Sequence, residues 1–398
     1  MPSPPATSLA DANGRNQLLK KNSKIKLSFC IPTLNRGPFL GTTLESIVSQ
    51  ATDEVEIVIV DGGSTDSTQE VIGQFQQRFA SLRYFREDVE RGDFSPQTPS
   101  SVGFDRDCDR AVELAVGEYC WLFTDDDLLR PGAVQTVLEA TRQQCGLIVV
   151  NAEVRSGDLS KVLEPARLHL TADRAYKSTE SQCLFTDVCN YLSFVGSVVI
   201  KRELWIARQK EQYIGTGFIH VGMVFQSPVP GKTLVIAQPL VTIRYGDALY
   251  MRSSRYFEIW MFAWPNLIWS FPHYSDLAKR QVCPKEPWRH NRTLLLFRAI
   301  GAFSSTEYSN FLAKRLNSRW DKFAARLIAS FPGSIANLIG VAYYYLSGRP
   351  PGQFLLDLVK SPFYFARAFN RPTTSPEKSP SELVPISGNA SRESKRVR

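Results

Sequence analysis

Between residues 26 and 151, short apolar runs alternate with segments of helical periodicity, and this alternation leaves few folds open to the chain. The β-branched run at 55–60 is typical of a central strand that is buried on both faces. Between such runs, apolar residues recur at helical spacing, as Leu40, Leu44 and Ile47 do. Repeated β-α units of this length predict an α/β fold, with a mostly parallel, Rossmann-like sheet flanked by helices.

Polar residues follow three of the expected strands at the point where each strand ends. The strands are expected at residues 26–31, 55–60, 82–85, 119–123 and 147–150. In the less regular segment that follows, strands are expected at 198–200, 234–236 and 241–245, with a helix around 202–209. The polar segments are residues 32–36, 61–66 and 124–127. Ligands of such sheets bind beyond the carboxyl ends of the strands. We therefore expect the three segments to form one site at a shared edge.

Three adjacent aspartates, Asp125, Asp126 and Asp127, come directly after the fourth apolar run. Mutual repulsion disfavours ionising all three together, and an unpaired carboxylate at a buried edge is costly. A divalent cation removes both problems, because hard oxygen ligands suit Mg²⁺ or Mn²⁺. Such a metal could also neutralise a departing diphosphate. The alternative is a solvated acidic turn before the helix that begins at Pro131.

The other two polar segments offer groups that suit a nucleotide. Asp61, at the end of a strand, can accept a hydrogen bond from a base N–H or a ribose hydroxyl. Gly62 and Gly63 permit close approach of the backbone to a ligand, and Arg36 offers a cation for phosphate. Each segment also fits a plain loop, and the second fits a strand-to-helix turn with a capping residue.

In this order and spacing, the segments resemble those of the family 2 glycosyltransferases of the GT-A fold. The resemblance covers about the first 130 residues, a third of the chain. The matching segments are residues 29–36 (FCIPTLNR), 58–66 (VIVDGGSTD), 115–119 (AVGEY) and 121–127 (WLFTDDD). The resemblance implies a nucleotide-sugar donor and metal-dependent transfer of its sugar to an acceptor hydroxyl.

The same resemblance implies roles for individual residues. The residues that it assigns to the donor are Pro32, Thr33, Asn35, Arg36, Asp61, Gly63, Ser64 and Asp125. Asp126 is the first choice of metal ligand. Asp127 supports it as a ligand and is also placed in the catalytic set.

One departure from the family pattern lies before the fourth strand. Family members commonly carry an Arg-Asn pair there, whereas this chain has Cys108-Asp109. Either Arg106 or Arg110 supplies the missing cation, or these arginines only pair with the neighbouring aspartates. We assign Arg106 to donor binding.

A second departure concerns the catalytic base. An inverting transferase needs a carboxylate to take the proton of the acceptor hydroxyl, and the matching place falls at residues 218–221, which hold no carboxylate. His220 is assigned as the base because its pKa lies near neutrality. A buried structural histidine is an equal alternative, and Asp187 and Glu203 are the fallback candidates.

Two further phrases are similar to those of the bacterial abequosyltransferase-type branch of the family. They are residues 117–123 (GEYCWLF), followed by the triple aspartate, and residues 257–260 (FEIW). This similarity implies a deoxyhexose donor and a polyprenyl-linked saccharide acceptor in O-antigen or cell-surface polysaccharide synthesis. Because no carboxylate base is found, a non-catalytic, membrane-associated module that binds nucleotide-sugars is the alternative.

The positive charge is concentrated in one stretch. The chain carries a net charge of +8, and residues 252–326 hold 13 Lys or Arg against 5 Asp or Glu, together with five of the seven tryptophans. Cations beside aromatic rings suit an anionic membrane surface. Nucleic acid would also suit them, but no nucleic acid is expected. The alternative is a helical subdomain with a solvated basic face.

Targeting signals and composition give the expected location and domains. The N-terminus lacks the apolar core of a signal peptide, and the apolar segment 335–346 is about half the length of a membrane span. Seven cysteines without a C-x-x-C pair favour a reducing compartment. We expect a cytoplasmic protein, peripheral on the inner face of a bacterial plasma membrane.

The expected domains are a flexible arm (1–24), a transferase domain (25–250, with a nucleotide-binding half 25–151 and an acceptor half 152–250), a helical, aromatic and basic membrane-associating region (251–371) and a flexible tail (372–398).

Overall fold

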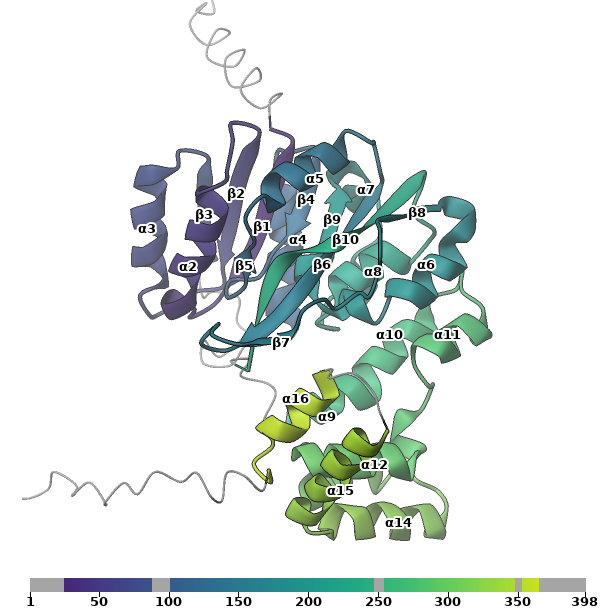
Figure 1. Cartoon of the computed structure of the whole chain (residues 1–398). Helices are drawn as coiled ribbons and strands as arrows, with labels where there is room; N and C mark the ends of the chain where they lie inside the picture. The colour runs from purple at the N-terminus through teal and green to yellow at the C-terminus, as the bar shows by residue number, and fades with distance from the viewer. Residues whose placement is uncertain (1–24, 88–100, 247–253, 348–352, 365–398) are drawn as a thin grey trace, which may run out of the picture.

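A computed structural model describes residues 25–87, 101–246, 254–347 and 353–364 (Figure 1). The predicted arm and tail lie outside these ranges. Ten strands form one sheet in the order β3-β2-β1-β4-β9-β6-β10-β5, with β7 paired to β6 and β8 to β10. The strands are β1 Leu27–Thr33, β2 Val55–Asp61, β3 Leu82–Arg86, β4 Tyr119–Leu122, β5 Leu128–Leu129, β6 Leu147–Ser156, β7 Val162–Glu164, β8 Arg174–Lys177, β9 Val198–Lys201 and β10 Lys232–Tyr245.

The main strands run mostly in one direction. β3, β2, β1 and β4 are parallel neighbours, and β6 and β10 are parallel to each other. β9 lies antiparallel between β4 and β6, so β6 points the same way as β4. This arrangement confirms the predicted α/β fold with a mostly parallel sheet. It brings the carboxyl ends of six strands to one edge.

The helices of the first half cover both faces of the sheet. They are α2 Gly37–Val48, α3 Thr68–Arg78, α4 Ser101–Leu114 and α5 Ala133–Thr141. The chain moves outward from β1 to β3 and then returns to β4. Right-handed crossovers therefore put α4 on the face opposite α2 and α3. All residues of β1 and β2 are buried, as expected of strands that are covered on both sides.

The middle of the chain differs from its prediction in detail. Two strands expected near 234–236 and 241–245 form the single strand β10, whose pairing is irregular around Pro239 because proline has no N–H to donate. The helix expected at 202–209 ends earlier, as α7 Arg202–Ile206. The other elements here are α6 Ser181–Val188, α8 Ile219–Phe225 and the 3₁₀ turns Ser178–Glu180, Tyr191–Ser193, Val195–Ser197 and Glu211–Tyr213.

The last part of the chain is helical, as predicted (Figure 1). Its elements are α9 Ser254–Glu258, α10 Trp264–Ser270, α11 Asp276–Val282, α12 Asn291–Ile300, α13 Ser305–Glu307, α14 Arg319–Ser330, α15 Gly333–Leu346 and α16 Gln353–Lys360, with π-helical segments Ile259–Ala263 and Tyr308–Leu312 and the 3₁₀ turn Pro287–Arg289. The boundary predicted at 250 lies outside the described residues. The core of the sheet continues past it, because Trp264 and Phe271 belong to that core.

The described residues of the helical part also form two smaller hydrophobic clusters, one around Phe257 and Phe303 and one around Ala336 and Leu358. Within the described ranges, no single helix has the length and apolar composition needed to cross a bilayer. Among the described helices, only α14 and α15 together pass that test, and they are bent by 95° where they meet.

Candidate active site

The first two predicted loops form one unit at the carboxyl edge of the sheet. The Asn35 N–H donates to Ser64 Oγ at 2.8 Å, and Asn35 Oδ1 accepts from the Thr65 N–H at 2.8 Å. Asn35 has a φ of 55°, in the left-handed region that asparagine tolerates better than most residues. The structure thus brings the loop after β1 against the loop after β2, as predicted.

Arg36 connects this unit to the acidic cluster after β4. Its Nε lies 3.3 Å from Asp125 Oδ1, and its Nη2 is paired with Asp126. The guanidinium also lies over the Phe39 ring, 4.7 Å from the centroid. The three charged side chains are between 13% and 19% exposed, so they reach solvent from a partly buried position. All three predicted segments therefore meet at Arg36.

Asp61 shapes the turn after β2. It is fully buried, and its Oδ1 accepts from the Gly63 N–H, the Ser64 N–H and the Ser64 hydroxyl at 3.1, 2.8 and 2.7 Å. Its Oδ2 accepts from the Tyr84 hydroxyl at 2.8 Å. Burial and this hydrogen bond raise the pKa of Tyr84 to about 12. Both oxygens are engaged inside the protein, so this structure does not show the open carboxylate predicted to touch the base or ribose.

The three aspartates of the cluster have different environments. Asp127 is only 3% exposed; its Oδ2 accepts from the Thr124 hydroxyl at 2.5 Å and its Oδ1 from the Arg244 N–H at 2.9 Å. Asp125 and Asp126 instead face Arg36. Burial and the neighbouring Asp126 charge raise the pKa of Asp125 to about 7, while Arg36 opposes that shift. Burial also raises the pKa of Asp126.

Arg244, near the end of β10, is a second cation at this cluster and was not found from sequence. Its Nε donates to the Asp126 carbonyl at 3.1 Å and its Nη1 to the Gly157 carbonyl at 2.8 Å. Its guanidinium lies 5.2 Å from the Phe39 centroid. No local motif surrounds Arg244, because its partners lie far away in the sequence.

A divalent metal fits this cluster only if substrate phosphates supply part of its ligands. Within the described part of the chain, no three His, Cys, Asp or Glu side chains converge on a point that could hold an ion. Mg²⁺, however, is commonly bound by one or two carboxylates together with substrate phosphates. Asp126, with Asp125 beside it, fits that arrangement. Asp127 does not fit the predicted support, because both its oxygens are buried and engaged by protein donors.

His220 lies in the core rather than at the site edge. It is 1% exposed, and its Nε2 is 2.8 Å from the Leu192 carbonyl. Burial lowers its pKa to about 4. These surroundings favour the structural alternative over the predicted catalytic base. The fallback candidates also point elsewhere, because Asp187 pairs with Arg174 and Tyr176 and Glu203 is 80% exposed at the opposite edge.

We expect the pH dependence of stability to reveal a buried, neutral His220. Its folded pKa lies below the usual 6.5, so the unfolded state gains a proton first as the pH falls. Wild type should lose stability relative to His220→Gln as the pH falls from about 6.5 to about 4, by up to about 3 kcal/mol. Urea unfolding at several pH values measures this difference. A loss of transfer of about 100-fold without a stability change would instead support the catalytic base.

Asp105 of α4 is another residue that sequence reasoning missed. It is fully buried and accepts from the N–H groups of Gly215, Gly217 and Ile219 at 2.9, 2.8 and 3.1 Å. Burial raises its pKa to about 7. Asp105 thereby holds the segment before α8 against α4, whereas Arg106, predicted to bind the donor, is exposed on the outer side of that helix.

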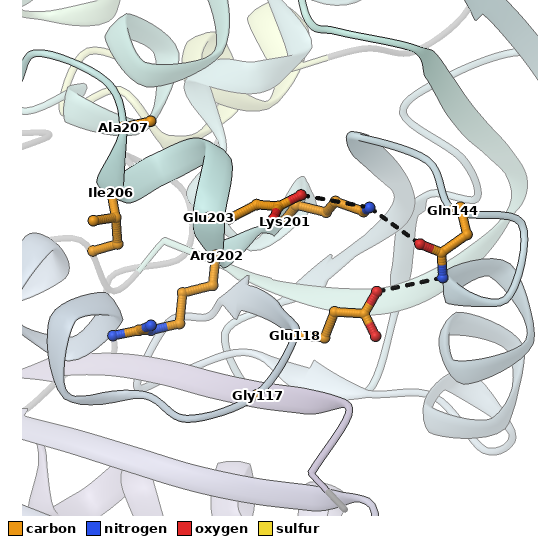
Figure 2. A pocket seen from close by; sticks show the side chains of 8 residues that line it. All are labelled: Gly117, Glu118, Gln144, Lys201, Arg202, Glu203, Ile206 and Ala207. Atoms are coloured by element: carbon orange, nitrogen blue, oxygen red, sulfur yellow. Dashed lines mark hydrogen bonds and ion pairs between the residues drawn. The ribbon is translucent and has the colours of Figure 1, made fainter. Parts of the chain in front are cut away.

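An open hollow of about 730 Å³ lies at the opposite edge of the sheet, beside the start of β4 and the end of β9 (Figure 2). Its charged side chains already have partners, since Arg202 donates to the Val112 and Glu113 carbonyls and Glu118 pairs with Lys26. Lys201 Nζ lies 3.6 Å from Glu203 and 3.1 Å from Gln144, and Gln144 donates to Glu118 at 3.3 Å. We assign no site to this hollow, because its polar groups already have partners.

Comparisons with known proteins agree with the geometry of the three loops. The family model described as glycosyl transferase family 2 matches residues 28–191. The abequosyltransferase RfbV of Salmonella typhimurium is 31% identical over 236 residues, which cover 56% of this chain and 67% of that protein. The chain therefore belongs to glycosyltransferase family 2, as its resemblance predicted.

Two other similarities are more distant. The GalNAc(5)-diNAcBac-PP-undecaprenol beta-1,3-glucosyltransferase of Campylobacter jejuni is 29% identical over 138 residues, covering 34% of this chain and 41% of that protein. Among solved structures, residues 1–349 of S. aureus TarS match with 14% identity and a TM-score of 0.48, covering 84% of this chain and 89% of that one.

Proposed function

We propose that this glycosyltransferase moves a sugar from a nucleotide-sugar donor to a hydroxyl of a lipid-linked saccharide, in O-antigen or other cell-surface polysaccharide synthesis. The observation that carries the proposal is the meeting of three loops at Arg36, beside Asp125 and Asp126. A cation next to solvent-reaching carboxylates suits a diphosphate and a divalent metal together.

The residues around the donor act as follows. Asp61 holds the turn that presents Gly63 and Ser64, while Asn35 joins this turn to the loop after β1. The buried Pro32 and Thr33 end β1 beneath that loop. In the proposed complex, Arg36 would exchange its pairs with Asp125 and Asp126 for donor phosphate oxygens.

The metal site is proposed at Asp126, with Asp125 beside it. Bound Mg²⁺ or Mn²⁺ would act as a Lewis acid toward the diphosphate leaving group. Arg244 holds the Asp126 carbonyl and the Asp127 carboxylate to β10, so the cluster keeps its place at the edge.

The donor sugar and acceptor are proposed from the relatives. Similarity to an abequosyltransferase favours a deoxyhexose donor, and similarity to an enzyme whose substrate name includes PP-undecaprenol favours a polyprenyl-linked acceptor. A lipid-linked acceptor in turn favours a peripheral position on the inner face of a bacterial plasma membrane, in keeping with the basic, aromatic residues 252–326.

A transfer assay tests this proposal. The full chain would be incubated with nucleotide-hexoses or nucleotide-deoxyhexoses, a polyprenyl-diphosphate saccharide, and Mn²⁺ or EDTA, and the acceptor mass would be measured. We expect a mass increase of one sugar, lost in EDTA. Calorimetry with nucleoside diphosphates is the companion measurement. Absence of both transfer and nucleotide binding would reject the proposal, whereas binding without transfer to any acceptor would favour the non-catalytic module.

A further inference from the structure

α15 lies at the end of the molecule remote from β1 to β3 (Figure 1) and contains no charged residue. Its inner face is fixed, because the buried Asn337 amide donates to the Ala299 and Leu358 carbonyls at 3.0 and 2.9 Å. Its outer face is also apolar, yet it remains exposed, with Leu338 at 53% and Leu346 at 87%. Large apolar groups gathered on one exposed face mark a surface that contacts a partner or a membrane.

α14, which precedes α15 across a two-residue break, carries two parallel stripes. Trp320, Phe323 and Leu327 are spaced to share one side of the helix, and all three are exposed, Trp320 by 81%. The cations Arg319, Lys322 and Arg326 repeat this spacing one residue earlier, about 100° around the helix. An apolar stripe beside a basic one is typical of helices that lie in a membrane interface.

We propose that the exposed apolar residues of α14 and α15, here called the docking face (Trp320, Phe323, Leu327, Leu338, Ile339 and Leu346), insert into the headgroup region of an anionic lipid bilayer, with the cation stripe of α14 on the lipid phosphates. The biological role of this membrane contact rests on the proposed function. Its test does not, because vesicle binding is measured without sugar transfer. α15, with 14 residues, is about 21 Å long and too short for the roughly 30 Å hydrocarbon core. α14 carries four charged residues, which favours a position along the interface.

A second copy of the chain or its own C-terminal residues would be repelled from the docking face by like charge. A two-fold symmetric dimer through this face would bring two copies of the same cation stripe together. The residues that follow the described chain include five Lys or Arg against three Asp or Glu between 372 and 398, so they share the sign of the stripe. Anionic lipid has the complementary charge.

The docking face is linked to the active edge through α16. α16 packs against α15. Its Asp357 accepts hydrogen bonds from the hydroxyls of Tyr245 and Tyr256, and its Lys360 donates to the Tyr245 carbonyl. Tyr245 directly follows Arg244, which holds the acidic cluster. Insertion of the docking face therefore sets the height and orientation of the site above the bilayer.

Flotation of the full chain with vesicles tests the proposal. Wild type should float with phosphatidylcholine vesicles that contain phosphatidylglycerol and float much less without it. Trp320→Glu combined with Leu338→Glu should lower binding at least about 10-fold. Replacing Arg319, Lys322 and Arg326 with Gln should lower binding about 100-fold at low salt, since each surface-proximal cation contributes about fivefold. Leu277→Glu, on the exposed face of α11, is the matched control and should bind like wild type.

Trp320 fluorescence and oligomeric state complete the test. Because the chain has seven tryptophans, wild type is compared with the glutamate variant, which lacks Trp320. Anionic vesicles should shift the emission of wild type to the blue more than that of the variant, and circular dichroism should show that the variant is folded. Unchanged flotation of that variant, an equal loss in Leu277→Glu, or a wild-type dimer that the variant splits without any lipid binding would each overturn the proposal. If transfer is absent from wild type while the docking-face variants still lose flotation selectively, the proposed function fails and the membrane face stands.

Discussion

Replacing Asp126 with alanine is expected to lower the rate of sugar transfer by about 100- to 1,000-fold while the fold remains intact. Asp126 is partly exposed to solvent, and its carboxylate pairs with Arg36, so its side chain is not part of the hydrophobic core. Its loss removes the proposed metal ligand at the position where the leaving diphosphate gains charge. Steady-state transfer with the lipid-linked acceptor measures the rate, and paramagnetic resonance of Mn²⁺ with a nucleoside diphosphate measures metal binding.

Two matched variants separate this effect from general damage to the protein. Asp276→Asn changes an exposed aspartate in the first turn of α11 and should leave transfer unchanged. Asp127→Asn should mainly lower stability, because Asp127 is buried between the Thr124 hydroxyl and the Arg244 N–H. Near-normal transfer and normal Mn²⁺ binding by Asp126→Ala would remove the proposed metal site.

Replacing Asp61 with alanine is expected to lower the free energy of unfolding by about 3–5 kcal/mol. The change leaves the hydrogen-bond donors of Gly63, Ser64 and Tyr84 without an acceptor at a position without solvent access. Unpaired buried donors cost more than the mean value of a hydrogen bond. Donor affinity should fall as well, because the turn that presents Ser64 loses its anchor. Urea unfolding followed by circular dichroism and calorimetry with a nucleoside diphosphate measure the two effects.

Asp158→Ala is the control for this second prediction. Asp158 also accepts several hydrogen bonds, from Ser156 and Ser160, but it lies in an exposed turn where water can replace it. Its loss should change stability little. If both alanine variants were equally destabilised, burial of Asp61 could not be the reason for its effect.

The first half of the fold was predictable because its signals are local. Hydrophobic periodicity marked β1, β2, β3 and β4 and the helices between them, and the carboxyl-edge rule placed three polar loops together. The contacts of Arg36 with Asp125 and Asp126 confirm that placement.

The second half was less predictable because its order depends on pairing between distant segments. β9 runs antiparallel between β4 and β6, and its short sequence carries no signal of direction. β10 was predicted as two strands because Pro239 interrupts its apolar pattern. In the structure, the pairing with β6 resumes beyond Pro239.

By itself, the sequence determined the family, the strands and helices of the first half and the three loops that meet at the site. Tertiary structure alone decided which carboxylates are open. The buried carboxylates of Asp61 and Asp127 accept hydrogen bonds from Tyr84 and Arg244, respectively, while the Asp126 carboxylate remains accessible to solvent. Residue type and spacing define the charges that a chain carries. Burial and distant partners decide which of those charges can meet a ligand, and both arise only when the strands pack.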